Sequence, residues 1–218
     1  MPDLRWLLLA LAACRAEPAP NKVDHDGTYA GRPIATTCSA AGAAWLDRAD
    51  REETEQPDVV LEALHLTPTM TVADVGAGTG YFTTRLAARV AHVHATDVQP
   101  EMIELLNKRV AKLANVTTHL ATAHDAALPA GCCDLVLLVD VYHELEDPPA
   151  VMAGIRRALT PNGRLVLVEY RGEDPAVAIK PEHKMTLVQV KTELTALGFT
   201  FVESLEMLRD QHVIVFRR

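Results

Sequence analysis

A short glycine-rich segment is the clearest candidate for a binding site in this chain. It reads Val72-Ala-Asp-Val-Gly-Ala-Gly-Thr-Gly80 and falls between a predicted strand and a predicted helix. In open α/β sheets, ligands bind at the carboxyl ends of the strands, and glycines there let the backbone approach the ligand closely. The spacing differs from the dinucleotide fingerprint, because Tyr81 stands where that fingerprint has its third glycine. Asp74 could accept a hydrogen bond from an ammonium group or a bridging water, but not from a pyrophosphate.

Two further aspartates follow the next two predicted strands. Asp97 ends the second strand, seventeen residues after Gly80, where a carboxylate can accept hydrogen bonds from both hydroxyls of a ribose. Proteins that bind NAD share this feature, so Asp97 indicates an adenosine ligand and not a particular reaction. Asp125 follows the third strand, where a carboxylate can accept from the amino group of an adenine.

A polar loop after the fourth predicted strand carries the residues that could act on a substrate. The loop contains Asp140, Tyr142, His143 and Glu144. His143 is the best candidate for a general base, and the other three side chains would assist it. The alternative is that this loop only closes the ligand site.

The rest of the chain predicts the elements that position these segments. Apolar residues recur at helical spacing over 101–113, and Leu135–Val139 is an apolar run typical of a parallel strand buried on both faces. Thr186 and Gln189 form a capping box at the start of a late helix. Two apolar runs at 199–205 and 212–216 suggest a terminal hairpin. We therefore expect an α/β fold, a doubly wound, seven-stranded, mostly parallel sheet with a C-terminal antiparallel hairpin.

The order of these motifs resembles the class I S-adenosylmethionine-dependent methyltransferases, close to the type found in ubiquinone and menaquinone biosynthesis. The resemblance covers roughly residues 57–218 and departs from the family pattern at Asn162, where glycine is commoner. It implies a Rossmann-like methyltransferase fold, S-adenosylmethionine as cofactor, and methyl transfer to a small molecule that the sequence does not identify. The alternative is a protein that binds a cofactor without methylating, or another enzyme on the same scaffold, such as an NAD-dependent reductase. The motifs that carry the resemblance are Asp74–Gly80, Asp97–Met102, Asp125–Pro129, Asp134–Asp140 and Leu159–Gly163.

The resemblance also implies a role for each matching residue. The three glycines would line the methionine part of the cofactor, and Asp74 would hold its amino group. Asp97 would bind the ribose, Met102 would pack on the adenine, and Asp125 would bind the adenine amine. The full set of expected cofactor-binding residues is Asp74, Gly76, Ala77, Gly78, Gly80, Asp97, Val98, Met102, His124, Asp125, Ala126 and Asp140.

Four residues outside these motifs are candidates for the substrate side. Trp45, Arg48 and Arg51 could form a lid, with an arginine meeting the cofactor carboxylate, or Trp45 could simply pack a helix on the domain. His183 could line the substrate pocket or lie in a solvated loop. Together with His143 and Glu144 it could in principle gather a metal, but the spacing specifies none, so no metal is predicted.

The net charge and the cysteines argue against a nucleic-acid partner, a zinc site and a disulfide. The formal net charge is −8 and no cluster of lysine and arginine is present, so we expect no nucleic-acid partner. The cysteines show no zinc-binding spacing, and the adjacent Cys132 and Cys133 are not expected to bridge each other. The sequence gives no oligomeric state.

The start of the chain predicts an export signal. The apolar run from Trp6 to Ala13 is too short to span a bilayer but suits a signal peptide, and Leu11-Ala-Ala-Cys14 resembles a bacterial lipobox. We expect a lipoprotein signal peptide over 1–13, a tether over 14–38, a helical cap over 39–66 and the cofactor-binding domain over 67–218. The protein would then be anchored by lipid on Cys14 in the cell envelope. The alternative is a non-functional signal and a cytoplasmic location.

Overall fold

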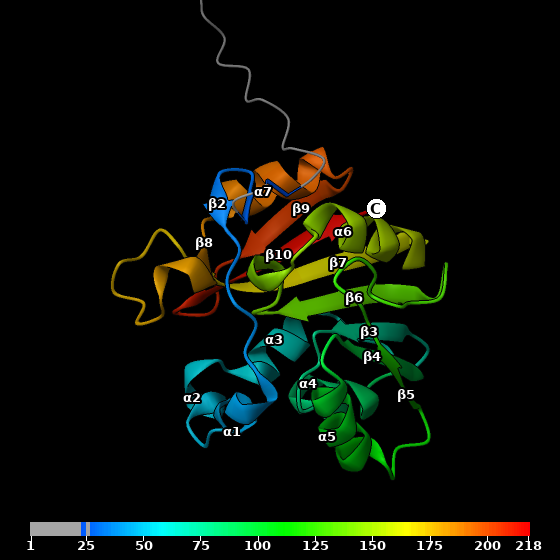
Figure 1. Ribbon diagram of the computed structural model, residues 1–218. Helices are drawn as coiled ribbons and strands as arrows, with labels where there is room; N and C mark the ends of the chain where they lie inside the picture. The colour runs from blue at the N-terminus through cyan, green and yellow to red at the C-terminus, as the bar shows by residue number, and fades with distance from the viewer. Residues whose placement is uncertain (1–22, 25–26) are drawn as a thin grey trace, which may run out of the picture.

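A twisted β-sheet runs through the centre of the computed structural model, which describes residues 23–24 and 27–218 (Figure 1). The strands follow the order β5-β4-β3-β6-β7-β10-β9, and the short strand β8 pairs with β7 beside this path. All pairs in this sheet are parallel except those that β10 makes with β7 and β9. The predicted seven-stranded, mostly parallel sheet with an antiparallel hairpin is therefore confirmed, with β8 as a short addition. The strands are β3 (Thr71–Val75), β4 (His92–Asp97), β5 (Val116–Leu120), β6 (Cys133–Val139), β7 (Leu159–Arg171), β8 (Lys184–Met185), β9 (Thr200–Leu205) and β10 (Gln211–Arg217).

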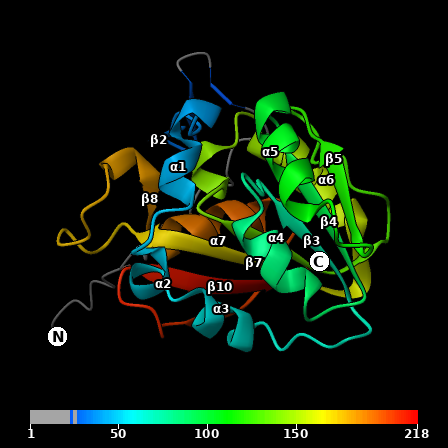
Figure 2. The same cartoon turned by 90° about the horizontal axis from the view of Figure 1, so that it is seen from below.

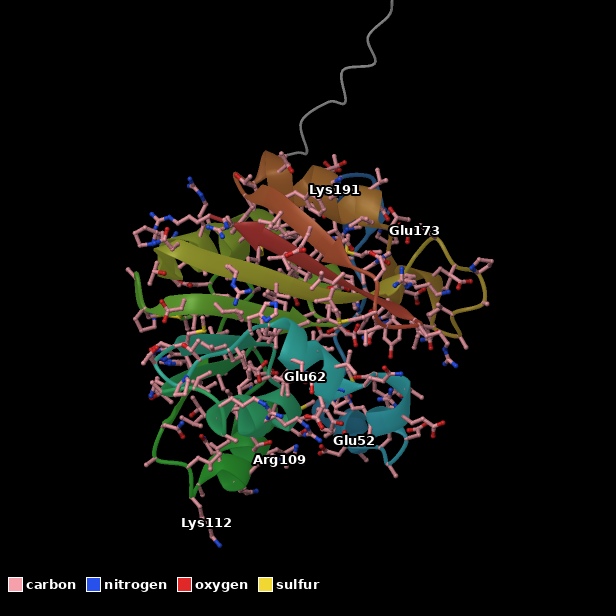
Figure 3. The ribbon with its side chains drawn as sticks, turned by 180° about the vertical axis from the view of Figure 1, so that it is seen from behind. Glu52, Glu62, Arg109, Lys112, Glu173 and Lys191 are labelled. Carbon is pink, nitrogen blue, oxygen red and sulfur yellow. A yellow bond between two sulfur atoms is a disulfide. The ribbon has the colours of Figure 1, made fainter. Side chains whose placement is uncertain are left out.

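Helices cover both faces of the sheet. One face packs against α6 (Pro148–Ala158) and α7 (Leu187–Ala196), and the other packs against α3 (Pro57–Ala63), α4 (Tyr81–Ala87) and α5 (Pro100–Val110). Seen from behind, α3, which carries Glu62, lies over the back of the sheet (Figure 3). Neighbouring residues of the central strands point to opposite faces, so each face has its own apolar core. The remaining short elements are β1 (Thr28–Tyr29), β2 (Arg32–Pro33), α1 (Ala43–Leu46), α2 (Arg51–Thr54) and the 3₁₀ turns η1 (Ala40–Gly42), η2 (Tyr142–Glu144) and η3 (Pro181–His183).

Local signals in the sequence explain where two of the helices begin. Thr186 precedes α7, where its hydroxyl accepts from the backbone N–H of Gln189 at 3.1 Å. The Gln189 side chain in turn accepts from the Thr186 N–H at 3.1 Å, so the predicted capping box is confirmed. Pro57 occupies the first turn of α3, where its missing N–H costs no hydrogen bond.

The N-terminal strands β1 and β2 pack on the domain instead of hanging free. Tyr29 and Arg32 are buried, and β2 lies beside α7 (Figure 1). Arg32 forms a bidentate ion pair with Glu193 of α7, at 2.9 and 3.0 Å. The backbone N–H of Ala35 donates to the carbonyl of His143 at 3.0 Å. Part of the segment predicted to be a tether over 14–38 is thus folded, because its two large side chains find buried partners.

The pairing of the cysteines differs from the prediction at Cys132 and Cys133. Cys132 and Cys133 are joined by a disulfide at the start of β6, so the prediction that they do not bridge is wrong. Cys38 is a free thiol. Adjacent cysteines in a turn leading into a strand can meet when the backbone brings both side chains together, which spacing alone does not reveal.

The Arg32–Glu193 pair gives a prediction for stability. Replacing Arg32 by Ala leaves the Glu193 carboxylate buried without its cation, so we expect a loss of about 3–5 kcal/mol in the free energy of unfolding. Denaturant titration followed by circular dichroism measures the loss. The control is Arg209→Ala, which breaks a bidentate pair with Asp210 on the surface. Equal unfolding midpoints for the two variants would show that the buried pair adds no stability.

Candidate active site

A cavity of about 570 Å³ opens at the carboxyl ends of the parallel strands. Its volume lies within the range of sites that enclose a small ligand. Strand β3 has β4 on one side and β6 on the other, so the strand order reverses here, as at the ligand sites of doubly wound folds. Helices α1 and α2 are gathered at this end of the sheet together with β8 (Figure 2). The cavity is therefore walled by the strand ends, the loops that follow them and the N-terminal cap.

The glycine loop forms one wall of this cavity. Gly76 and Gly78 have φ angles of +71° and +53°, a conformation that favours glycine. A Cβ atom added at Gly76 would lie 2.5 Å from Cγ2 of Val141, so a side chain there would collide with the loop after β6. Gly76 and Ala77 both donate their backbone N–H groups to the carbonyl of Thr96. Gly80 does not line the cavity; it turns the chain into α4.

Two of the predicted aspartates lie in the cavity wall. Asp74 is buried and its Oδ2 accepts from the Thr83 hydroxyl at 2.6 Å. Burial raises the pKa of Asp74 to about 6. Asp97 accepts from the backbone N–H of Gly78 and of Gln99, each at 2.9 Å, and burial raises its pKa. A carboxylate offers about four acceptor sites, so Asp97 can still bind the two hydroxyls of a ribose.

Only some of the residues that were predicted to bind the adenine line the cavity. Met102, Val98 and Ala126 line the cavity. His124 and Asp125 do not: both are exposed, His124 contacts Asp147 at 2.8 Å, and Asp125 accepts from the Ala127 N–H at 3.0 Å. A tight turn between Thr122 and Asp125 directs these side chains outward, and Thr122 and Ala123 face the cavity in their place.

The opposite end of the cavity is built around His143. The side chain of Glu169, at the end of β7, accepts from the Tyr142 N–H at 2.9 Å and lies 2.5 Å from Nδ1 of His143. When the ring is neutral and Nδ1 donates to Glu169, Nε2 of His143 is an acceptor, and it lies within hydrogen-bond distance of Nδ1 of His183, at 3.1 Å. Glu144 completes the group, with Oε1 at 3.9 Å from His143 and 3.5 Å from His183. An imidazole held in this way can accept a proton or bind a metal through Nε2.

Burial and charge act against each other in this group. Burial alone lowers the pKa of His143, but the charge of Glu169 and its hydrogen bond outweigh this and the net pKa is raised. Burial raises the pKa of Glu144 to about 7. Burial and the neighbouring His143 lower the pKa of His183.

Asp140 and Tyr142, two of the four predicted catalytic residues, have different positions. Asp140 lines the cavity, and both of its oxygens accept from Nε2 of Gln211, at 3.0 and 2.9 Å. Burial and then the charge of Glu55 raise the pKa of Asp140. Tyr142 is fully buried outside the cavity wall and donates its hydroxyl to Glu193 at 2.8 Å. Tyr142 is therefore held away from any substrate, because η2 turns its side chain into the core.

The cap contributes Trp45 and Arg51 to the cavity, whereas Arg48 does not line it. Arg48 and Arg51 both pair with the buried Glu55, at 2.6 and 2.7 Å. The Arg48 guanidinium lies over the ring of Trp45, 3.9 Å from its centroid. Glu55 thus ties the two arginines of the predicted lid together beneath the cavity, an interaction that no sequence motif indicated.

Residues of the site that were not predicted come mainly from strand ends. Glu169 follows the apolar run of β7, and a carboxylate at the end of a buried strand was the available signal for it. Gln211 starts β10 and had no such signal. Cys38, Thr79, Tyr81 and Tyr170 also line the cavity.

Comparisons with known proteins relate this chain to methyltransferases. A model of the family described as a methyltransferase domain matches residues 73–167. An uncharacterised methyltransferase of Mycobacterium tuberculosis (strain ATCC 25618 / H37Rv) is 40% identical over 97 residues, 44% of this chain and 38% of that protein. A demethylmenaquinone methyltransferase of Tropheryma whipplei (strain Twist) is 31% identical over 126 residues, 58% of this chain and 52% of that protein. The chain thus spans about half, or less, of the length of these curated relatives.

A solved structure extends the likeness over most of the fold. The crystal structure of a SAM-dependent methyltransferase from Aquifex aeolicus is 25% identical to this chain, with a TM-score of 0.76. The match covers 83% of this chain and 98% of the other. The glycine loop and Asp97 lie within residues 73–167, which the family model matches. Residues 73–167 therefore match a methyltransferase domain, and the chain shares its Rossmann-like fold with S-adenosylmethionine-dependent methyltransferases.

Proposed function

We propose that this protein transfers the methyl group of S-adenosylmethionine to a small molecule. The observation that carries the proposal is that one cavity contains both a cofactor wall and a polar acceptor wall. The cofactor wall consists of the glycine loop, Asp74 and Asp97. The acceptor wall consists of His143, Glu144 and His183. Methyl transfer from a sulfonium is an in-line displacement, so it needs the two reactants in one enclosed space with their reacting atoms aligned.

A small acceptor agrees with the shape and charge of the site. The cap residues Trp45 and Leu46 lie over the cavity, and Leu46 Cδ1 would be 2.9 Å from a Cβ atom at Gly78. The acceptor wall is lined by carboxyl and imidazole groups, which favour neither a phosphate backbone nor an acidic polymer. A formal net charge of −8 also argues against a nucleic-acid substrate.

The alternative function is another reaction on the same scaffold, such as hydride transfer with NAD. Binding distinguishes the two: calorimetry should show that S-adenosylmethionine and S-adenosylhomocysteine bind and that NAD does not. A metabolite extract incubated with methyl-labelled S-adenosylmethionine should then yield a labelled small molecule. Binding of NAD in place of S-adenosylmethionine would contradict the proposal.

Asp97 is expected to provide much of the cofactor affinity. Asp97→Ala should weaken binding of S-adenosylmethionine by about 1.5–3 kcal/mol, the usual cost of losing hydrogen bonds to a charged group. Asp97→Asn keeps the shape of the side chain and tests the charge. The matched control is Asp125→Ala, since Asp125 is exposed and does not line the cavity. A titration in which Asp97→Ala binds as tightly as wild type would remove Asp97 from the cofactor site.

Cofactor affinity is expected to depend on pH through Asp74. The ionised carboxylate is the form that holds an ammonium group, and burial places the pKa of Asp74 at about 6 in the free protein. Affinity should therefore be high above this pH and fall as pH decreases below it, by up to about tenfold per pH unit. Calorimetric titrations from pH 5 to about 8 measure this. Asp74→Asn should bind more weakly and lose this part of the pH dependence, and an unchanged pH profile would exclude Asp74 as its source.

We further propose that a lipid on Cys14 anchors the protein to a membrane of the cell envelope. The support is the lipobox-like Leu11-Ala-Ala-Cys14 after a short apolar run; these residues lie outside the described part of the chain. Among residues 23–24 and 27–218, no helix is long and apolar enough to cross a membrane. A diacylglycerol on the cysteine supplies two acyl chains, which suffice for stable anchoring.

Fractionation of wild type and Cys14→Ala tests the anchor. Wild type should sediment with membranes and carry a lipidated amino-terminal cysteine in mass spectrometry, and Cys14→Ala should not. The control is Cys38→Ala, which alters the free thiol in the cavity and should leave the protein on the membrane. Because S-adenosylmethionine is made in the cytosol, an anchored enzyme needs a cytosolic face or imported cofactor. A soluble protein that retains Met1 would place the enzyme in the cytoplasm.

A further inference from the structure

We propose that His143, His183 and Glu144 bind a divalent transition-metal ion of the Zn²⁺ type at the acceptor end of the cavity. Of the described residues, these three form the one cluster whose histidine, cysteine or carboxylate ligand atoms lie close enough together to share a metal. Their spacing in sequence specifies no metal, because His183 comes from η3, far along the chain from η2. The fold brings the three together.

The three ligand atoms are spaced as a metal requires. The distance from Nε2 of His143 to Nδ1 of His183 is 3.1 Å, and the distances from these atoms to Oε1 of Glu144 are 3.9 and 3.5 Å. A triangle with these sides has its centre about 2 Å from each corner, which is close to the length of Zn–N and Zn–O bonds. An ion at or just above this centre therefore reaches all three atoms without movement of the backbone.

The ligand types also favour such an ion. Two imidazoles and one carboxylate form the set used by catalytic zinc sites that keep a further position for water or substrate. Mg²⁺ and Ca²⁺ prefer oxygen ligands, so two nitrogen ligands select against them. The three residues all line the cavity, and the His183 side chain is 25% exposed. The open positions of the ion would therefore face the space that holds the acceptor.

A buried carboxylate already orients the central ligand. Glu169 is fully buried and lies 2.5 Å from Nδ1 of His143, so it favours the neutral tautomer with the proton on Nδ1, whose Nε2 lone pair can bind the ion. Metal-binding histidines usually donate their other N–H to such a carboxylate or carbonyl. Glu169 also accepts from the Tyr142 N–H, and Ala35 holds the carbonyl of His143, so the backbone of η2 is fixed as well.

The ion would define what His143 does in the reaction. A metal lowers the pKa of a bound water or hydroxyl group, so an acceptor hydroxyl bound to it loses its proton more easily. In this assignment His143 is a metal ligand and does not itself remove the proton, which would pass to solvent water in the open cavity. This consequence for the acceptor rests on the proposed function; the metal site itself rests on the geometry of the three residues.

Zn²⁺ titration of the full chain tests the site. After dialysis against a chelator, we expect calorimetry to show one Zn²⁺ per chain at this site and no comparable binding of Mg²⁺. His183→Ala and Glu144→Gln should each abolish or strongly weaken that binding, and Glu169→Gln should weaken it by about 10- to 100-fold. Co²⁺ in place of Zn²⁺ should give a visible absorption band that the same variants remove. S-adenosylmethionine affinity, measured on each variant, should stay at the wild-type value and report that the fold is intact.

Surface histidines provide the controls. Nδ1 of His94 and Nε2 of His119 lie 3.0 Å apart on the sheet and could also bind Zn²⁺, and His124 is an exposed histidine paired with Asp147. His119→Ala and His124→Ala should leave the binding at the cavity unchanged. Zn²⁺ binding that survives His183→Ala but is lost in His119→Ala would overturn the proposal, as would absence of Zn²⁺ binding in a protein that binds S-adenosylmethionine. Failure to bind S-adenosylmethionine would instead contradict the proposed function.

Discussion

The contact between the Glu169 carboxylate and η2 is the interaction on which the acceptor end of the site depends. One oxygen accepts from the Tyr142 N–H and the other faces Nδ1 of His143, so a single side chain fixes both the backbone and the ring. Glu169 is fully buried, and a buried carboxylate is costly unless its lone pairs are satisfied. The two contacts to η2 meet this need. The same requirement that stabilises the end of β7 therefore aims Nε2 of His143 into the cavity.

This contact functions only because of the order of strands in the sheet. Placing β6 between β3 and β7 sets the loop after β6 between the glycine loop on one side and Glu169 on the other. Val141 in that loop packs so closely on Gly76 that a Cβ atom at Gly76 would lie 2.5 Å from its Cγ2. The glycine loop of the cofactor wall is thus packed against the loop that leads from β6 into His143. This close packing suits a reaction in which two bound molecules must be aligned.

The sequence predicts the parts of this arrangement that depend on local pattern. The apolar strands, the capping box at Thr186 and the glycine loop follow from residue type and spacing, and the structure contains each of them. Prediction from sequence is weaker where long-range packing determines the position of a side chain. Asp125 follows the expected strand but turns outward, because it lies in a tight turn that Thr122 and Asp125 close. The meeting of His183 with His143 depends on how the long loop after β7 folds back, which no local pattern encodes.

Several carboxyl groups lie in or behind the wall of this cavity. Each has a different partner: Glu55 has two arginines, Glu169 has His143, and Asp140 has the amide of Gln211. Glu144 accepts a backbone hydrogen bond from Cys38, and its nearest side-chain nitrogens are imidazole nitrogens at 3.5 and 3.9 Å. These contacts only partly offset the loss of hydration, so burial raises the pKa of Glu144 to about 7. These carboxyl groups can therefore lie close together because three of them have dedicated side-chain partners, while the fourth, Glu144, takes up a proton more readily than a solvated glutamate does.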